Sequence, residues 1–297
     1  MMQLLGKTIL ASMALTIAGL LATPLSNAAS AAECKDTTSR LATILKRGKL
    51  LAGVRYDYPP NGYVDPTGQN MGFGPDMARE FAKHLGVSLE MIQTKADTRI
   101  PMIQNGIIDL DIGPTTPTKA RSEVVDFSYT YVWDRSVIVV REGMSKKPED
   151  YYNDTKSIVA DLQGGNFEKM WLAHAPNAKT KLYQENPDLI VALSQKQVDV
   201  ALVSEFTAYS IIEKLGDRAK GLVVGDAFAS DPQAIILPRN DSTWRNWVNW
   251  ALQRMWKDGT FKELYKKAYK TDPPFHIWEN GQLQPGVEAV SNNCDPW

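Results

Sequence analysis

Short apolar runs alternate with amphipathic segments along the chain. Apolar residues dominate 50–55, 110–112 and 198–203, which predicts buried strands. Residues 76–85 carry apolar side chains at helical spacing, and Gly86 follows them, a residue typical of the position after a helix. This alternation of strands and helices predicts an α/β fold with parallel strands.

A second unit of the same kind follows the first. The other predicted strands are 88–93 and 157–160, and the other predicted helices are 99–105, 167–173, 189–196, 205–215 and 244–255. Two extended apolar segments, 136–140 and 234–238, stand before and after the second unit. Two such segments crossing between two α/β halves would form a paired hinge. The last helix would then pack back on the first half.

The N-terminal segment has the pattern of a secretory signal. Lys7 precedes an apolar run over 8–22, and small residues follow over 26–32. A signal anchor is the alternative, but the run is short for a bilayer span, which needs about 20 apolar residues. We expect a signal peptide over 1–32 and a soluble mature chain in the periplasm.

Composition and charge narrow the classes of function. The 297 residues are 43% hydrophobic and 23% charged, as in globular proteins, and 33 basic against 34 acidic residues leave no basic field for nucleic acid. Export favours a disulfide between Cys34 and Cys294. The three histidines lack the spacing of metal ligands, so we expect no metal and no cofactor.

Six motifs, in order along the chain, resemble those of the periplasmic polar-amino-acid-binding proteins of ABC importers. They occupy 53–60, 72–77, 99–109, 113–121, 125–128 and 198–203. The resemblance extends over about 41–269 and is nearest to the glutamate- and aspartate-binding members. It implies a two-lobed, hinged α/β fold of the type II periplasmic binding proteins. Lobe 1 would comprise 33–138 and 236–297, and lobe 2 would comprise 139–235.

The resemblance also implies how an amino acid would be held. Arg121 matches the family arginine that binds the α-carboxylate, where a planar guanidinium can donate two parallel hydrogen bonds. Thr116 matches a hydroxyl that contacts the same ligand. Gly165 and Asn166 replace the hydroxyl residues of the family's second-lobe contact, where backbone N–H groups at a helix start can still bind a carboxylate.

The ligand's ammonium group needs an acceptor. Glu205 occupies the position of the family's ammonium-binding aspartate, with Ser204 as a substitute if Glu205 points away. The alternative interpretation of Glu205 is an acidic residue that stabilises a helix N-terminus.

Arg55 and Arg99 stand where glutamate- and aspartate-binding relatives carry additional arginines. Three converging guanidinium groups would suit a second carboxylate on the ligand. Alternatively, Arg55 is a surface residue at a strand end, and Arg99 pairs with Asp97. Tyr58 could wall the cleft, or it could be a core aromatic residue.

The resemblance predicts that the protein is the substrate-binding component of an ABC importer. We also expect it to be a monomer whose partner is a membrane permease. A ligand-binding protein of the same fold in a sensor or oxidoreductase system is the alternative. Cyclohexadienyl dehydratases share the fold, but Ala208 stands at the position of their catalytic acid. Alanine cannot act as a general acid, so we expect no enzymatic activity.

Overall fold

The computed structural model describes residues 36–275 and residue 277. The expected signal peptide over 1–32 lies outside the described residues, as do Cys34 and Cys294. Among the helices of the described ranges, none combines the length and apolar character needed to cross a bilayer.

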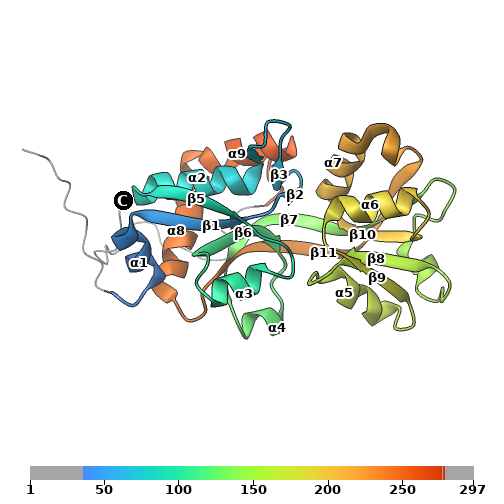
Figure 1. The fold of residues 1–297 in the computed structure, drawn as a ribbon, viewed down its shortest axis with the longest axis horizontal. Coiled ribbons are helices and arrows are strands. Elements are labelled where there is room, and N and C mark those ends of the chain that lie inside the picture. Colours follow the sequence, from blue (N-terminus) through green and yellow to red (C-terminus); the bar gives the residue numbers. More distant parts are fainter. Residues whose placement is uncertain (1–35, 276, 278–297) are drawn as a thin grey trace, which may run out of the picture. The chain divides into compact units, whose positions relative to one another are not determined.

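One mixed sheet of eight strands runs through the structure in the order β5-β1-β6-β11-β7-β10-β8-β9 (Figure 1). Its strands are β1 (Lys49–Val54), β5 (Ser88–Gln93), β6 (Leu110–Thr115), β7 (Asp126–Arg141), β8 (Ile158–Leu162), β9 (Lys179–Tyr183), β10 (Val200–Ser204) and β11 (Leu222–Leu237). Strand β1 pairs in parallel with β5 and β6, and β8 pairs in parallel with β9 and β10. The predicted α/β fold with parallel strands in two lobes is confirmed.

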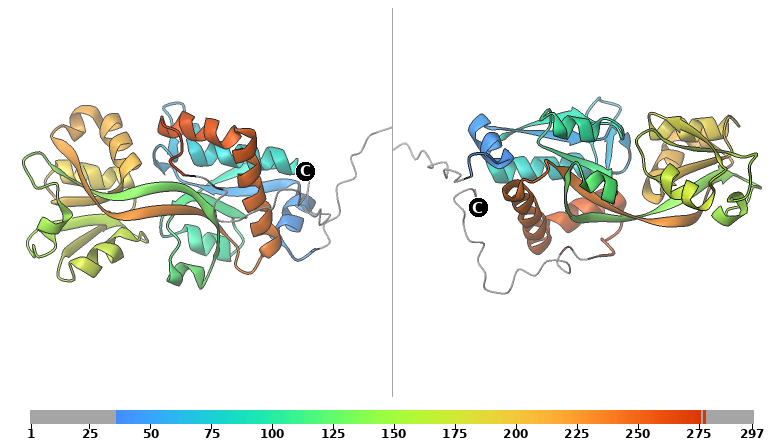
Figure 2. Two further views of the ribbon diagram at one scale, coloured as in Figure 1. Left: turned by 180° about the vertical axis from the view of Figure 1, so that it is seen from behind. Right: turned by 90° about the horizontal axis from the view of Figure 1, so that it is seen from below.

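Strands β7 and β11 run between the lobes as an antiparallel pair (Figure 2). Each has 16 residues, and their register extends from Leu222 opposite Arg141 to Leu237 opposite Asp126. The apolar pattern predicted only 136–140 and 234–238, because polar residues such as Asp134 and Asp231 interrupt both strands. The paired hinge is present and longer than the sequence pattern predicts. The lobe boundaries given above stay a prediction.

Lobe 1 holds the first three parallel strands and both ends of the described chain. Its helices are α1 (Arg40–Arg47), α2 (Phe73–Leu85), α3 (Arg99–Gln104), α4 (Lys119–Ser122), α8 (Ser242–Asp258) and α9 (Thr260–Tyr269), and its small sheet is β2 (Asp57–Tyr58), β3 (Gly62–Val64) and β4 (Asn70–Met71). Phe73 packs edge-on against Phe261 and Tyr265, at 5.3 and 5.6 Å between ring centroids. Both C-terminal helices therefore pack on lobe 1, through the same core that buries Trp244 and Trp247. This packing was predicted for α8 and not for α9.

Lobe 2 has helices on both faces of its sheet. They are α5 (Phe167–His174), α6 (Asn186–Ser194) and α7 (Glu205–Leu215), with 3₁₀ turns η1 (Pro148–Tyr151) and η2 (Gly216–Ala219). Because successive strand residues point to opposite faces, Val139 packs with α6 and α7, whereas Ile138 packs with Trp171 of α5. Strand β7 therefore contributes side chains to a core cluster on each face of the sheet.

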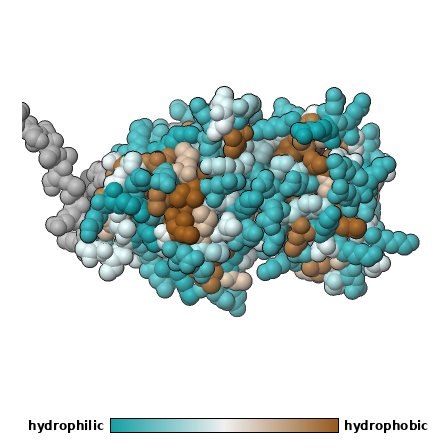
Figure 3. All heavy atoms as spheres, viewed as in Figure 1, coloured by the Kyte–Doolittle hydropathy of each residue, from teal (hydrophilic) through white to brown (hydrophobic). Residues whose placement is uncertain are grey.

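The apolar pattern of the sequence did not predict the short or half-polar elements. The strands β2, β3, β4 and β9 and the helices α1, α4 and α9 had no prediction. The face shown in Figure 3 is mostly hydrophilic; its largest apolar patch lies on lobe 1, and smaller apolar patches lie on both lobes.

Candidate ligand-binding site

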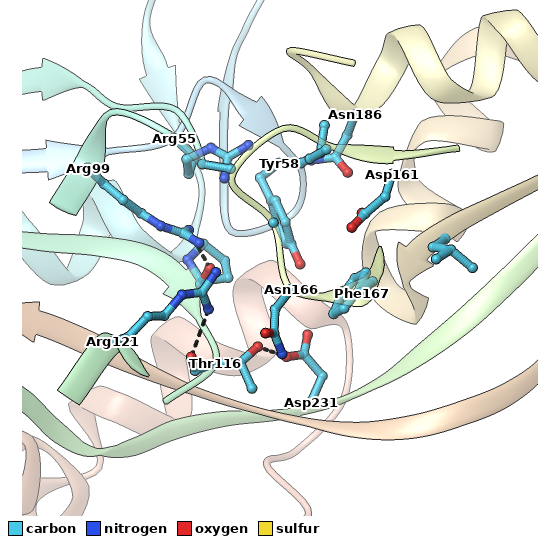
Figure 4. A pocket seen from close by; sticks show the side chains of 15 residues that line it. Arg55, Tyr58, Arg99, Thr116, Arg121, Asp161, Asn166, Phe167, Asn186 and Asp231 are labelled. Atoms are coloured by element: carbon cyan, nitrogen blue, oxygen red, sulfur yellow. Dashed lines mark hydrogen bonds between the residues drawn. The ribbon is translucent and has the colours of Figure 1, made fainter. Parts of the chain in front are cut away.

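A cavity lies between the two lobes, at the carboxyl ends of the parallel strands. Such ends are the usual place for ligands in open α/β sheets. Lobe 1 contributes Arg55, Tyr58, Ala96, Arg99, Pro114, Thr116 and Arg121, lobe 2 contributes Asp161, Leu162, Gly165, Asn166, Phe167, Asn186 and Leu202, and the hinge contributes Asp231. Figure 4 shows the three arginines on the lobe 1 side and Asp161, Phe167 and Asn186 facing them.

Arg55 directly follows β1 and is buried, with 1% of its surface exposed. Its Nε and Nη2 each donate to the Asp57 carboxylate at 2.8 Å. Asp57 Oδ2 also accepts from the backbone N–H of Asn186, at 3.1 Å, which links lobe 1 to lobe 2. Burial alone would lower the pKa of Arg55, but the Asp57 carboxylate raises it above its usual value. Arg55 is therefore charged in the folded protein, and its charge is already paired with that of Asp57.

Arg99 begins α3 and is buried to 3% exposure. It forms no salt bridge with the described residues, although the Asp111 carboxylate favours its charge from nearby. Its Nη1 donates to the Pro114 carbonyl at 2.8 Å rather than to Asp97, and its buried Nε has no hydrogen-bond partner. Burial, followed by the like charges of Arg121 and Arg55, lowers the pKa of Arg99 to about 9. The guanidinium is thus held in an environment that disfavours its charge.

Arg121, in the short helix α4, spans the gap between the lobes. Its Nη1 donates to the Thr116 carbonyl at 2.8 Å, and its Nη2 donates to the Gly164 carbonyl of lobe 2 at 3.1 Å. Burial lowers the pKa of Arg121, while the carboxylates of Asp231 and Asp161 act in the opposite direction.

Hydroxyl groups of both lobes form hydrogen bonds with Asp231 of the hinge. The Thr116 hydroxyl donates to Asp231 Oδ1 at 2.6 Å, and the Ser204 hydroxyl donates to Asp231 Oδ2 at 2.8 Å. The Tyr58 hydroxyl forms a hydrogen bond with Ser204. Gln233 Nε2 also donates to Asp231, at 2.8 Å. Both oxygens of Asp231 are therefore occupied.

On the lobe 2 side, Asp161 lies near the end of β8 with 2% of its surface exposed. Its Oδ2 accepts from the Glu168 backbone N–H at 2.7 Å. Burial raises the pKa of Asp161 to about 7, against the opposing effect of hydrogen bonds from the backbone. Gly165 and Asn166 follow in the loop that leads into α5.

Seven of the eight residues expected to bind ligand line this cavity: Arg55, Tyr58, Arg99, Thr116, Arg121, Gly165 and Asn166. The eighth, Glu205, does not. Its carboxylate accepts from Arg135 Nε at 2.7 Å and forms an ion pair with that arginine, so its charge is neutralised beside β7. The binding roles of the seven stay predictions.

Sequence reasoning overlooked the carboxylates Asp161 and Asp231. Each is a charged residue inside a strand, in the segments 158–162 and 222–237, where a buried acid needs a partner or a ligand. An apolar pattern stops at such residues, so the predicted segments 157–160 and 234–238 exclude both acids. Asn186 and Phe167 reach the cavity from helix starts that gave no such signal.

Comparison with known proteins agrees with this architecture. Residues 50–271 match the family described as bacterial extracellular solute-binding proteins, family 3. The L-cystine-binding protein TcyJ of Escherichia coli (strain K12) is 28% identical over 235 residues, which cover 78% of this chain and 86% of that protein. The ABC transporter glutamine-binding protein GlnH of Bacillus subtilis (strain 168) is 29% identical over 253 residues, or 84% of this chain and 90% of the relative.

A similar solved structure is that of the ancestral amino acid-binding protein AncCDT-1, a precursor of cyclohexadienyl dehydratase. It is 32% identical, with a TM-score of 0.71, and the match covers 78% of this chain and 100% of that chain. The relatives are substrate-binding proteins named for amino acids, and the matched region includes both lobes and the cavity. The chain therefore belongs to family 3 of the bacterial extracellular solute-binding proteins.

Proposed function

We propose that this protein is the periplasmic substrate-binding component of an ABC importer and that it captures an acidic amino acid. The observation that carries the choice of an acidic ligand is the convergence of Arg55, Arg99 and Arg121 on one side of the cavity. The relatives' printed ligands, cystine and glutamine, differ from each other, so the side chain of the ligand has to be inferred from this cavity.

The charges of the arginines are unequally compensated. Arg55 is neutralised by Asp57. Arg99 and Arg121 donate to backbone carbonyls, and within the described part of the chain neither forms a salt bridge. Buried charges require partners, and a carboxylate is the best geometric match for a guanidinium. A dicarboxylate amino acid would supply one carboxylate to Arg121, as the family resemblance implies, and a second to Arg99 beside Arg55.

Capture would proceed by closure of the lobes around the hinge. Contacts that join the lobes are already formed: Asp57 with Asn186, Arg121 with Gly164, and Lys95 with Glu185 at 2.9 Å. A ligand that touches both lobes binds the closed state more strongly and therefore shifts the population toward it. A membrane permease would recognise that closed form. In this proposal the protein is a monomer. Lobe 1 comprises 33–138 and 236–297, and lobe 2 comprises 139–235.

Export is part of the same proposal. The description of the family as extracellular supports a signal peptide over 1–32 and a periplasmic mature chain. An oxidising compartment supports the disulfide between Cys34 and Cys294.

We further infer that the protein binds its ligand without transforming it. Ala208, at the position that matches the catalytic acid of the dehydratases, is fully buried in α7 and does not line the cavity. A role in a sensor or oxidoreductase system uses the same cavity and differs only in the partner that recognises the closed lobes.

A thermal-shift screen of the mature, disulfide-intact chain tests the ligand class. It covers the proteinogenic amino acids, plain dicarboxylates and keto acids, because a ligand that binds only the folded state raises the melting temperature. We expect shifts for glutamate or aspartate that exceed those for glutamine and asparagine. Larger shifts for neutral or basic amino acids would contradict the acidic ligand, and no shift from any compound would contradict the proposed function.

A further inference from the structure

The carboxylates of Asp57, Asp161 and Asp231 differ in how many side-chain hydrogen bonds they accept. Asp231 accepts three side-chain hydrogen bonds. Asp57 accepts two from Arg55 and two from Asn186, through its backbone N–H and its side-chain amide. Among the described residues Asp161 accepts from the backbone alone, from the Glu168 N–H to Oδ2 and from Leu162. Because a carboxylate can accept about four hydrogen bonds, Asp161 keeps capacity for a charged donor, and its side chain lines the cavity.

The position of Asp161 suits the end of a ligand opposite its carboxylates. Figure 4 shows it across the cavity from Arg99 and Arg121, on the lobe 2 side. A ligand whose carboxylates meet the arginines would present its ammonium group toward lobe 2. The family position for this contact, Glu205, is already paired with Arg135 outside the cavity lining.

We propose that Asp161 accepts the α-ammonium group of the ligand and that capture consequently releases a proton from this carboxyl. The inference rests on the proposed function, because it assumes an amino acid whose carboxylates lie on the arginines. It adds a residue that selects amino dicarboxylates against plain dicarboxylates, and it makes capture dependent on pH.

The surroundings of Asp161 determine that dependence. Glu168 of α5 raises the pKa of the carboxyl, and Arg121 of α4 lowers it, while Arg99 and Asp231 line the same cavity. Burial is the largest cause, and it holds the pKa at about 7. The group is then only about 3% ionised at pH 5.5. Since only the ionised form binds an ammonium, the apparent dissociation constant at pH 5.5 should be about 30-fold higher than at pH 8.

The test is a calorimetric titration of L-glutamate and of glutarate, which lacks the ammonium group, into the wild-type protein and the Asp161→Asn variant. Asparagine keeps the shape and the acceptor for the Glu168 N–H but removes the charge. We expect the variant to bind glutamate at least about tenfold more weakly at pH 7.5, with no pH dependence between 5.5 and 8. It should bind glutarate as well as, or better than, the wild type does.

Proton release is a second measurement that needs no variant. Titrations at pH 6 in buffers of different ionisation enthalpy should show about 0.9 protons released per glutamate bound by the wild type. Asp134→Asn is the matched control, because Asp134 is another buried acid, with a pKa raised to about 8, that does not line the cavity. This control should retain the pH dependence and the proton release.

Two failures can be told apart. If the wild type binds glutamate without proton release, or if Asp161→Asn weakens glutamate and glutarate equally, the role of Asp161 is overturned and the proposed function stands. If the wild type binds no amino acid at any pH, both are overturned.

Discussion

Replacing Arg99 with methionine should stabilise the ligand-free protein while impairing capture. The structure buries this guanidinium with one backbone acceptor and with two like charges nearby, which outweigh the Asp111 carboxylate. Its pKa is therefore lowered from its ordinary value to about 9. At 1.36 kcal/mol per pKa unit, the folded state disfavours the charged form by about 4–5 kcal/mol. The destabilisation is complete below pH 9 and decreases as the pH rises above 9, so it is fully present at neutral pH.

The variant also loses a stabilising contact. A hydrogen bond from a charged donor contributes about 1.5–3 kcal/mol, which the Pro114 carbonyl would lose. We therefore expect Arg99→Met to raise the free energy of unfolding by about 1–3 kcal/mol. In a domain of this size, 1 kcal/mol corresponds to about 2–4 °C in melting temperature. Urea unfolding of the ligand-free protein at pH 7.5 measures the difference through the transition midpoint.

Arg55→Met is the matched control, because Arg55 is equally buried but bound to Asp57. Its removal leaves a buried carboxylate without its partner and should destabilise the protein by about 3–5 kcal/mol. The two substitutions should therefore change the free energy of unfolding in opposite directions. If Arg99→Met destabilises the protein as Arg55→Met does, Arg99 is a structural residue and the reasoning is wrong. If it stabilises the protein but leaves glutamate affinity unchanged, Arg99 does not bind the ligand.

Three other predictions follow from the site and the hinge. Arg121→Ala should weaken glutamate binding by about 2–5 kcal/mol in calorimetry, and an unchanged dissociation constant would remove Arg121 from the site. Gly164→Ala should favour the open form, because Gly164 has a φ of +75° and a methyl group there would stand 2.5 Å from the Asp97 Cα of lobe 1. Ligand affinity should fall at least about tenfold while the ligand-free protein loses only about 1–2 kcal/mol in urea unfolding, and wild-type affinity would refute the clash. Burial raises the pKa of Asp134 to about 8, so its stabilising contribution is present in acid and is lost as the pH rises through 8. Asp134→Asn should therefore exceed the wild type in urea midpoint at pH 9, with the difference decreasing below pH 8 and closing near pH 4; a difference independent of pH would argue against this titration.

The sequence predicted the strands with continuous apolar runs, such as β1 and β10, because burial on both faces leaves a simple pattern. It predicted only parts of β7 and β11, since these strands carry the buried acids Asp134 and Asp231. Those acids have partners contributed by other elements, and such contacts are set by the tertiary fold.

The same distinction separates the site residues. Arg55, Arg99 and Arg121 could be found because their motifs have fixed spacing, and they do line one cavity. Glu205 begins α7 as its motif predicts, but Arg135, 70 residues earlier, holds its carboxylate. Asp161 had no motif, and only its burial opposite the arginines identifies it.

The central claim is that buried guanidinium groups select an acidic amino acid. Calorimetric titration of the mature, ligand-free protein with L-glutamate and with L-glutamine tests it most directly, because the two differ only in the charge and hydrogen bonding of one group. The account predicts that glutamate binds at least tenfold more tightly at pH 7.5 and that Arg99→Met removes the preference. Equal affinities, or tighter binding of glutamine by the wild type, would contradict the claim.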